Sequence, residues 1–402
     1  MINSESKSQA RFRFHGRIPS SKSILNRLLV LRFFEPRLTI EGDSEADDVM
    51  KMKAALAQMK SGEVADCGSA GTTLRFLALL ASRYPGVHQL KGSARLFARP
   101  QTEITRLLRQ LGCEAEWSPE LLIIRGQGWV VPESGVRIDR TISSQFASAL
   151  ILSAWGLNAP LLIHFEGEAV SEGYLEMTLQ LVKRMGMKWR MSEDGKSLTI
   201  PEGSTIEVSH AVAESDLSSA FAIAALAALD GEAVFESWPD HSLQPDRVFV
   251  EILRSMGCRV EHNSSARTLR IQKPVSGRLS AIKKDLRDCP DLFPVLAVLC
   301  GFAQGTSVLF GAPHLMHKES SRIEKSNELL RLLGIQTKLI DGGLEIKGLE
   351  RSSVAQKVFE FNPSDDHRLA MAAAVAKAAG APVRVLHPEV VNKSFPEFWS
   401  YL

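Results

Sequence analysis

The 402-residue chain has no excess of charge of one sign and no long apolar run. Its 48 basic and 46 acidic residues leave a net charge of +2, so no global field indicates binding to nucleic acid or to a membrane surface. The longest uncharged apolar stretches, Phe221–Leu229 and Phe293–Ala303, are far shorter than the ~18–20 residues that cross a bilayer. Any anion site must therefore depend on a few placed basic residues.

Cysteine is also scarce. The chain has five cysteines, an odd number, and no two of them form a C-x-x-C pair. This argues against a disulfide framework and a structural zinc site, and it favours a reducing compartment. The first ten residues are polar and have no apolar segment of the kind found in secretory signals. We therefore expect a cytoplasmic, globular protein, and the length predicts two or three domains.

A repeated phrase runs through the chain: apolar residues, a basic residue, a large apolar residue and glycine. The glycines, Gly112, Gly186, Gly257 and Gly334, lie 74, 71 and 77 residues apart. Each is followed by two short alternating runs, at 113–117 and 121–124, 187–191 and 198–200, 258–262 and 269–271, and 335–340 and 344–346. Because glycine commonly ends helices, the pattern predicts four helices that each lead into a β-hairpin.

A second signal has the same period. Clusters of Ser, Asp or Gly, which cap helices, open apolar helical stretches. These openers lie at about Ser20, Ser69, Ser143, Ser215, Asp288 and Asp365. The chain is therefore predicted to contain six copies of a unit with two helices and several strands. Only 7 residues separate Gly62 from the second opener, so the first copy is expected to lack its hairpin.

The ends of the chain predict how the six copies are divided. The sixth copy ends at Leu402 without its last strands, and the segment Ala10–Ile18 alternates like a strand. We expect this segment to complete the sixth copy and to bring both termini into one domain. Six units then divide into two α/β domains of three: residues 19–228, and residues 1–18 together with 229–402. The chain would cross between them twice.

The helix openers also hold the suggestive polar residues. Helix N-termini carry roughly half a positive charge and free N–H groups, which makes them anion sites. The first opener holds Lys22, Ser23 and Arg27, with Ser23 and Arg27 on one helix face. The second has Gly71 among small residues but no P-loop lysine, so a nucleotide loop is not indicated. Taken singly, each phrase is as typical of a capped surface helix as of a site.

Taken in order, the phrases resemble the EPSP synthase (3-phosphoshikimate 1-carboxyvinyltransferase) family of enolpyruvyl transferases, from about Gly16 to Leu402. The matching segments are Pro19–Arg27, Ser69–Arg75, Arg95–Pro100, Ser143–Gln145, Val170–Tyr174, Pro290–Asp291, Lys318–Arg322, Asp366–Arg368 and Lys393–Pro396. The resemblance implies a two-domain inside-out α/β barrel with three βαβαββ units in each domain, which agrees with the repeat count.

The resemblance also implies a reaction that joins shikimate 3-phosphate to phosphoenolpyruvate through a tetrahedral adduct and releases phosphate. The implied catalytic residues are Asp291 as general base, Glu319 as proton donor to C3, Lys22 and Lys318. Phosphoshikimate would be held by Lys22, Ser23, Arg27, Ser143, Ser144, Gln145, Ser171, Tyr174, Asp291, His314 and Lys318. Phosphoenolpyruvate would be held by Lys22, Gly71, Arg99, Gln145, Arg322, Arg368 and Lys393. No metal and no cofactor are implied, and we expect a monomer.

Six positions depart from the family pattern: Ser20, Ser69, Glu172, Gly173, His314 and Ser321. None of them replaces a proton-transfer residue, so they bear on substrate affinity more than on reaction type. Two alternatives stay open. The sister UDP-N-acetylglucosamine enolpyruvyl transferase has a catalytic loop cysteine that would fall near Ala94, where this chain has none. The other is a catalytically silent binding relative, against which the intact catalytic set argues.

Overall fold

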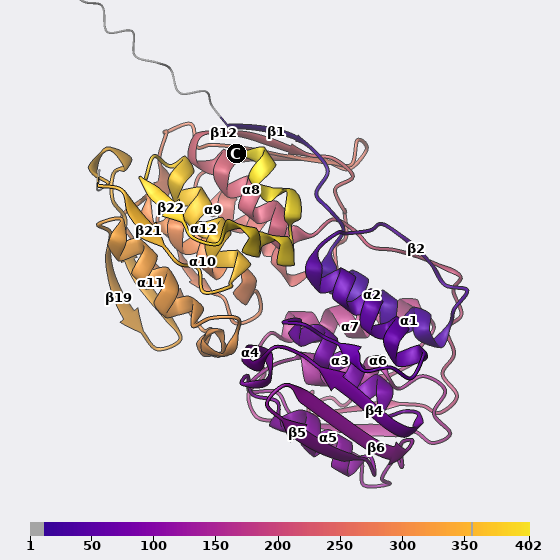
Figure 1. Cartoon of the computed structure of the whole chain (residues 1–402). Helices are drawn as coiled ribbons and strands as arrows, with labels where there is room; N and C mark the ends of the chain where they lie inside the picture. The colour runs from indigo at the N-terminus through magenta and orange to yellow at the C-terminus, as the bar shows by residue number, and fades with distance from the viewer. Residues whose placement is uncertain (1–11, 355–356) are drawn as a thin grey trace, which may run out of the picture.

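The computed structural model describes residues 12–354 and 357–402 and contains two separate hydrophobic cores (Figure 1). One core consists of buried residues between 24 and 213. The other takes Phe14 and Ile18 together with residues between 217 and 398. The chain thus forms two α/β domains. The first eleven residues, which include the polar N-terminal segment and the start of the predicted strand at Ala10, lie outside the described residues.

The first domain carries two four-stranded sheets with the same topology, ordered β3-β4-β6-β5 and β7-β8-β10-β9. In each sheet the first two strands are parallel and a hairpin adds the other two. The strands are β3 (Ala65–Asp66), β4 (Pro85–Lys91), β5 (Glu114–Ser118), β6 (Leu121–Gln127), β7 (Val136–Asp139), β8 (Leu161–Glu166), β9 (Arg190–Met191) and β10 (Ser197–Ile200). The helices are α3 (Gly71–Ala81), α4 (Ala94–Phe97), α5 (Thr102–Gln110), α6 (Gln145–Leu152) and α7 (Glu172–Arg184).

The second domain repeats this topology in the sheets β1-β12-β14-β13 and β16-β18-β20-β19. Their strands are β1 (Phe12–Gly16), β12 (Gly231–Phe235), β13 (Arg259–Asn263), β14 (Thr268–Gln272), β16 (Lys283–Asp285), β18 (Thr306–Phe310), β19 (Gln336–Ile340) and β20 (Gly343–Lys347). The helices are α8 (Leu217–Asp230), α9 (Phe249–Ser255), α10 (Phe293–Gly301) and α11 (Arg322–Leu332). Strands β15 (Leu279–Ser280) and β17 (Ala303–Gln304) form a small parallel pair beside them.

Two units are reduced to one parallel strand pair each. In the first domain β2 (Thr39–Glu41) pairs with β11 (His210–Val212), next to α1 (Lys22–Phe34) and α2 (Asp47–Lys60). In the second, β21 (Phe359–Phe361) pairs with β22 (Val383–Val385) around α12 (His367–Ala378). The predicted loss of the first hairpin is therefore confirmed, and the sixth copy also ends without one.

The N-terminal strand corrects one expectation. Strand β1 does not complete the sixth copy; it runs parallel to β12 and supplies the first strand of the fourth copy. The strand that precedes α8 in sequence, β11, instead pairs with β2 in the other domain. The segments before α1 and α8 have thus exchanged domains, and Phe14 packs against Phe235 and the C-terminal Tyr401.

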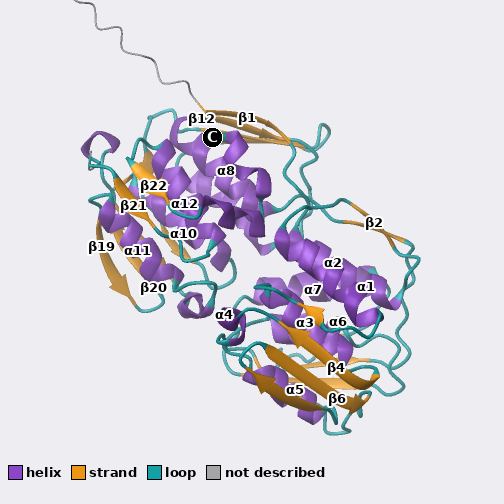
Figure 2. Cartoon of the chain, in the orientation of Figure 1, coloured by secondary structure: helices purple, strands orange, loops and turns teal. Residues whose placement is uncertain are grey.

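The four repeat glycines end their helices as predicted. Gly112, Gly186, Gly257 and Gly334 have φ angles of 77°, 111°, 92° and 83°, the left-handed region that favours glycine. Helices α3, α6, α8, α10 and α12 are almost entirely buried, and the sheets lie outside them (Figure 2). This arrangement is the predicted inside-out barrel. Along the described residues, no helix combines the length and the apolar content that crossing a membrane requires.

Candidate active site

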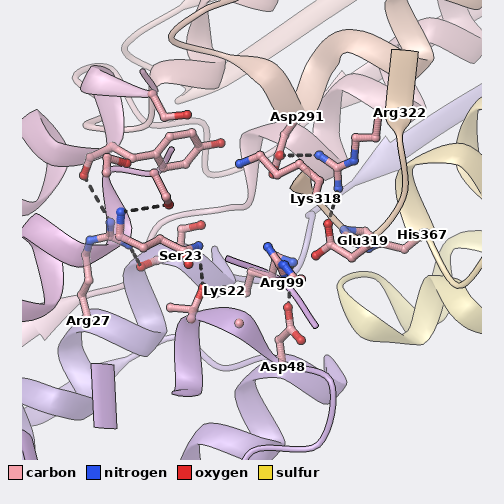
Figure 3. Close-up of a pocket in the computed structure, with 17 residues that line it drawn as sticks. Lys22, Ser23, Arg27, Asp48, Arg99, Asp291, Lys318, Glu319, Arg322 and His367 are labelled. Atoms are coloured by element: carbon pink, nitrogen blue, oxygen red, sulfur yellow. Dashed lines mark hydrogen bonds and ion pairs between the residues drawn. The ribbon is translucent and has the colours of Figure 1, made fainter. Parts of the chain in front are cut away.

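A cavity lies between the two domains, where several helices begin (Figure 3). The first residues of α1, α3, α6, α11 and α12 all line it, so free backbone N–H groups and partial positive charges gather there. The described lining residues are Lys22, Ser23, Arg27, Asp48, Gly71, Thr72, Arg99, Ser143, Ser144, Gln145, Ser171, Tyr174, Asp291, Lys318, Glu319, Arg322 and His367.

Arg322 lies at the centre of the charge cluster and is 1% exposed. Its Nη1 lies 2.7 Å from Asp291 Oδ1, its Nη2 3.0 Å from Glu319 Oε2, and its Nε 2.8 Å from Asp366 Oδ2. Asp366 also caps α12 by accepting from the backbone N–H of Arg368. One guanidinium therefore holds both predicted proton-transfer carboxylates close together.

Neighbouring cations decide the charge of these two carboxylates. Burial favours the neutral acid at Asp291, but Arg322 and then Arg368 hold its pKa far below the usual range. Burial also favours the neutral acid at Glu319. Lys393, 3.4 Å away, and Arg322 outweigh burial and hold the pKa of Glu319 well below its usual value. Both groups are ionised in this arrangement and can accept protons.

Lys318 has a pKa below that of an ordinary lysine. Burial lowers its pKa to about 8, and the nearby Arg322 charge adds to this, while Asp291 opposes it. A lysine with this pKa exchanges its proton close to neutral pH. In Figure 3 Lys318 lies beside Asp291 on the wall opposite Lys22. Proton transfer near these groups is therefore chemically available.

Several donors around the cavity have no partner among the described residues. They include Nε of Arg99, Nε and Nη1 of Arg368, and one of the two unpartnered ring nitrogens of His367, since a neutral imidazole carries a single N–H. Arg99 lies directly over Gly71, where an added Cβ would be 2.8 Å from its Nη1. Burial, with help from Lys22, keeps the pKa of His367 well below its usual value. Bound oxyanions would satisfy these donors.

Arg75 holds the residues at the start of α6 in place beside the cavity. Its Nη1 donates to Ser143 Oγ at 3.1 Å and to Gln145 Oε1 at 2.9 Å, and its Nε donates to Gln101 Oε1 at 3.1 Å. The guanidinium also stacks on Phe146 at 4.5 Å. Arg75 is buried and fixes the hydroxyl and amide groups that open α6.

Arg27 has fewer donors to offer than the sequence suggested. Its guanidinium donates to Thr178 Oγ1 at 2.7 Å, to the Ser23 and Tyr174 carbonyls at 2.8 and 3.2 Å, and to Ser148 Oγ at 3.4 Å. A guanidinium has five N–H donors, so most of them are engaged within the protein. Burial lowers its pKa to about 10.

All but three of the predicted site residues line the cavity. The exceptions reach it through a neighbour: His314 through Ser171 at 3.2 Å, Arg368 through Asp291 at 3.4 Å, and Lys393 through Glu319 at 3.4 Å. The sequence analysis missed Arg75 and the lining residues Asp48, Thr72 and His367, although Arg75, Thr72 and His367 stand inside segments it singled out. Asp48 binds Lys22 Nζ at 2.9 Å, and an acidic first helical turn is too common to reveal that role.

Two departures from the family pattern are accommodated locally. The negative charge of Glu172 is offset by Arg140, 3.2 Å away, and the Glu172 side chain is 57% exposed. Ser69 contributes its backbone carbonyl, which accepts from Lys393 Nζ at 3.1 Å. A backbone contact does not depend on the side chain, so neither change removes a charge from the cavity wall.

Two α/β domains of tandem repeats, joined across a cavity lined by cations and paired carboxylates, define an inside-out barrel suited to small polyanions. The solved structures agree with this class. An EPSP synthase from Acinetobacter baumannii superposes with a TM-score of 0.71 at 21% identity over 97% of this chain and 95% of that one. The enolpyruvyl transferase NikO from Streptomyces tendae gives a TM-score of 0.71 at 13% identity, over 98% and 94%. These likenesses show the fold.

The particular family follows from the sequence. The EPSP synthase (3-phosphoshikimate 1-carboxyvinyltransferase) profile matches residues 17–402. A 3-phosphoshikimate 1-carboxyvinyltransferase from Syntrophobacter fumaroxidans is 32% identical over 95% of this chain and 94% of its own length. One from Methanopyrus kandleri is 34% identical over 85% and 77%. The chain belongs to the EPSP synthase family.

Proposed function

We propose that this chain transfers the enolpyruvyl group of phosphoenolpyruvate to the 5-hydroxyl of shikimate 3-phosphate and releases phosphate. The observation that carries the proposal is the interdomain cavity, in which one arginine, Arg322, holds the carboxylates of Asp291 and Glu319 amid unpaired donors. Each substrate carries a phosphate and a carboxylate, which need such a set of cations and helix N-termini. Family membership supports the same reaction, a step of aromatic amino-acid biosynthesis.

The reaction needs two proton transfers at one place. The substrate 5-oxygen bonds to C2 of phosphoenolpyruvate while its proton passes to a base and C3 gains a proton. The tetrahedral adduct then loses phosphate from C2 and a proton from C3, which restores the double bond. We assign Asp291 and Lys318, whose pKa is about 8, to the proton transfer at the hydroxyl. We assign Glu319 as the donor to C3, a role that requires bound anions to share the charge of Lys393 and Arg322 and so raise its pKa.

We propose that each domain binds mainly one of the two substrates. We assign residues 19–228 mainly to phosphoshikimate, and residues 1–18 with 229–402 to catalysis and phosphoenolpyruvate. The proposed phosphoshikimate ligands are Lys22, Ser23, Arg27, Ser143, Ser144, Gln145, Ser171, Tyr174, Asp291, His314 and Lys318. The proposed phosphoenolpyruvate ligands are Lys22, Gly71, Arg99, Gln145, Arg322, Arg368 and Lys393. The unpaired donors of Arg99 and Arg368 support the second set.

Phosphate release tests the proposal. We expect free phosphate only when shikimate 3-phosphate and phosphoenolpyruvate are both present, with one phosphate for each enolpyruvyl ether formed. Turnover with UDP-N-acetylglucosamine instead would identify the sister activity, which Ala94 in place of a loop cysteine disfavours. Saturable binding of both substrates without turnover would identify a silent relative and refute the enzymatic proposal.

We further propose that the enzyme acts as a monomer in the cytoplasm. Both domains of a single chain contribute to the cavity lining, and the lining holds most of the proposed ligands. All five cysteines are free and buried, which fits a reducing compartment. Sedimentation analysis of the purified protein tests the oligomeric state.

A further inference from the structure

The start of α7 contacts the second domain beside the cavity. The Ser171 N–H donates to the Arg287 carbonyl at 3.0 Å, and the Glu172 N–H donates to Asp288 Oδ1 at 3.1 Å. Ser171 has φ 55°, a left-handed conformation that a non-glycine residue holds only when its surroundings impose it. The second domain thus fixes the backbone of Ser171.

Gly173 makes this close approach possible. A Cβ at this position would lie 2.6 Å from Cβ of Pro245, a contact that real Cβ atoms essentially never show. The ring of Pro245 is rigid, so the two segments could not stay this close with a larger residue in α7. At the next residue, Tyr174 Oη donates to Asp246 Oδ2 at 2.7 Å and adds a third hydrogen bond between the domains.

His314 meets Ser171 in this contact. Its Nε2 lies 3.2 Å from Ser171 Oγ, and both residues are only 3% exposed. Ser171 lines the cavity together with Ser143 and Ser144, whereas the described lining does not include His314. The histidine can therefore act on a bound ligand only through the serine hydroxyl.

If the three serines hold a phosphate, the number of available protons determines which nitrogen of His314 is protonated. A phosphate dianion offers only acceptors, so the single hydroxyl proton of Ser171 goes to the phosphate. The Ser171 oxygen can then only accept from His314, which requires the proton of the neutral ring to be on Nε2. Burial, with Lys318 next and Arg322 and Arg287 adding to it against Asp291, lowers the pKa of His314 to about 3 and keeps the ring neutral.

We propose that His314 is a positioning residue that donates its Nε2–H to Ser171 across the domain interface and so aims the serine hydroxyl at the phosphate of shikimate 3-phosphate. The inference rests on the proposed function. Gly173 lets α7 approach closely enough for that donor to reach.

A double-mutant cycle on shikimate 3-phosphate binding, measured by titration calorimetry without phosphoenolpyruvate, tests the inference. His314→Phe keeps a ring but removes the donor, and we expect about tenfold weaker binding, as for one lost hydrogen bond to a charged ligand site. His314→Gln keeps a donor and should bind within about threefold of wild type. The double variant with Ser171→Ala should bind no worse than Ser171→Ala alone.

Three readouts separate positioning from general damage. The KM for shikimate 3-phosphate should rise in His314→Phe, while kcat and the KM for phosphoenolpyruvate change by less than about threefold. His317→Phe, at an exposed position of the same 3-10 helix, should match wild type in all three. ¹⁵N-histidine spectra of the wild-type complex should show the Nε2–H tautomer.

Losses that add in the double variant, or an Nδ1–H tautomer in the complex, would overturn the inference. If His314→Phe does not fold, the tautomer and His314→Gln still decide it. Failure of the proposed function looks different, because wild-type protein would then release no phosphate, whether or not it binds shikimate 3-phosphate. Normal wild-type turnover with an additive cycle refutes the positioning role alone.

Discussion

Glu319→Gln separates proton delivery from substrate binding. The substitution keeps the shape of the side chain and one oxygen, which can accept either from Arg322 Nη2, 3.0 Å from Oε2, or from Lys393 Nζ, 3.4 Å from Oε1. It removes the negative charge and the ability to transfer a proton. Any effect on catalysis should therefore come from chemistry and not from a collapse of the cavity wall.

The magnitude follows from the role. General acid catalysis contributes typically ~10²–10⁴-fold, which corresponds to about 3–5 kcal/mol of barrier. Substrate binding should change far less, and phosphoenolpyruvate binding should tighten, because Arg322 and Lys393 lose a competing anion. Since these cations hold the pKa of Glu319 well below its usual value, the acid form needs bound anions that share their charge.

The assay is initial-rate phosphate release with both substrates varied, together with calorimetric dissociation constants. We expect kcat to fall by about 10³-fold while each dissociation constant changes by less than about tenfold. Glu324→Gln, an exposed residue in the first turn of α11, is the matched control and should behave as wild type. Equal losses in kcat and in affinity would show that Glu319 only binds substrate, and would refute the proton-donor assignment.

Three further predictions follow from single contacts. Gly71→Ala places a methyl group 2.8 Å from Arg99 Nη1, so steady-state kinetics should show a KM for phosphoenolpyruvate raised by about tenfold with that for phosphoshikimate little changed. Arg75→Met frees Gln145 and should raise both KM values while an unfolding titration shows a loss of about 1–3 kcal/mol. His314 has a folded pKa of about 3, below its unfolded ~6.5, so its contribution is present above pH 6.5 and is lost as pH falls toward 3; between pH 7.5 and pH 5, urea titrations should show a change in stability that is less favourable by about 2 kcal/mol in wild type than in His314→Gln.

The repeat could be predicted from the sequence because it depends on residues that end and cap helices locally. A glycine after an apolar helical run has few alternatives to a left-handed helix end, which is why Gly112 and Gly334 located their hairpins. The helix openers likewise located most of the cavity, because capping residues and anion ligands occupy the same helix ends. These signals depend on neighbours in sequence, and a single chain displays them directly.

Contacts between distant residues left no such signal. Alternation identified a strand near Phe14, but period-two patterning does not say which parallel partner a strand will choose. Arg75 belongs to a recognised phrase, yet its contact with Ser143 spans 68 positions in the sequence. The contact between His314 and Ser171 spans 143, and only the closed domain interface reveals it.

The strand exchange that sequence reasoning could not find is also what brings the two cavity walls into register. Where the chain crosses between domains, the Ser21 N–H donates to the Glu214 carbonyl at 2.7 Å and the Asp216 N–H donates to the Pro19 carbonyl at 2.9 Å. Helix α1 begins at once after the first crossing and α8 after the second. The starts of the two helices are therefore tied together, although they belong to different domains.

Each tied helix start carries part of the site. Lys22 is the first residue of α1, and Ser218, in the first turn of α8, accepts from the guanidinium of Arg368. A hinge that held the domains by a flexible linker would leave the distance between these cations free. The paired crossing segments instead tie the start of α1, which carries Lys22, to the start of α8, whose Ser218 contacts Arg368.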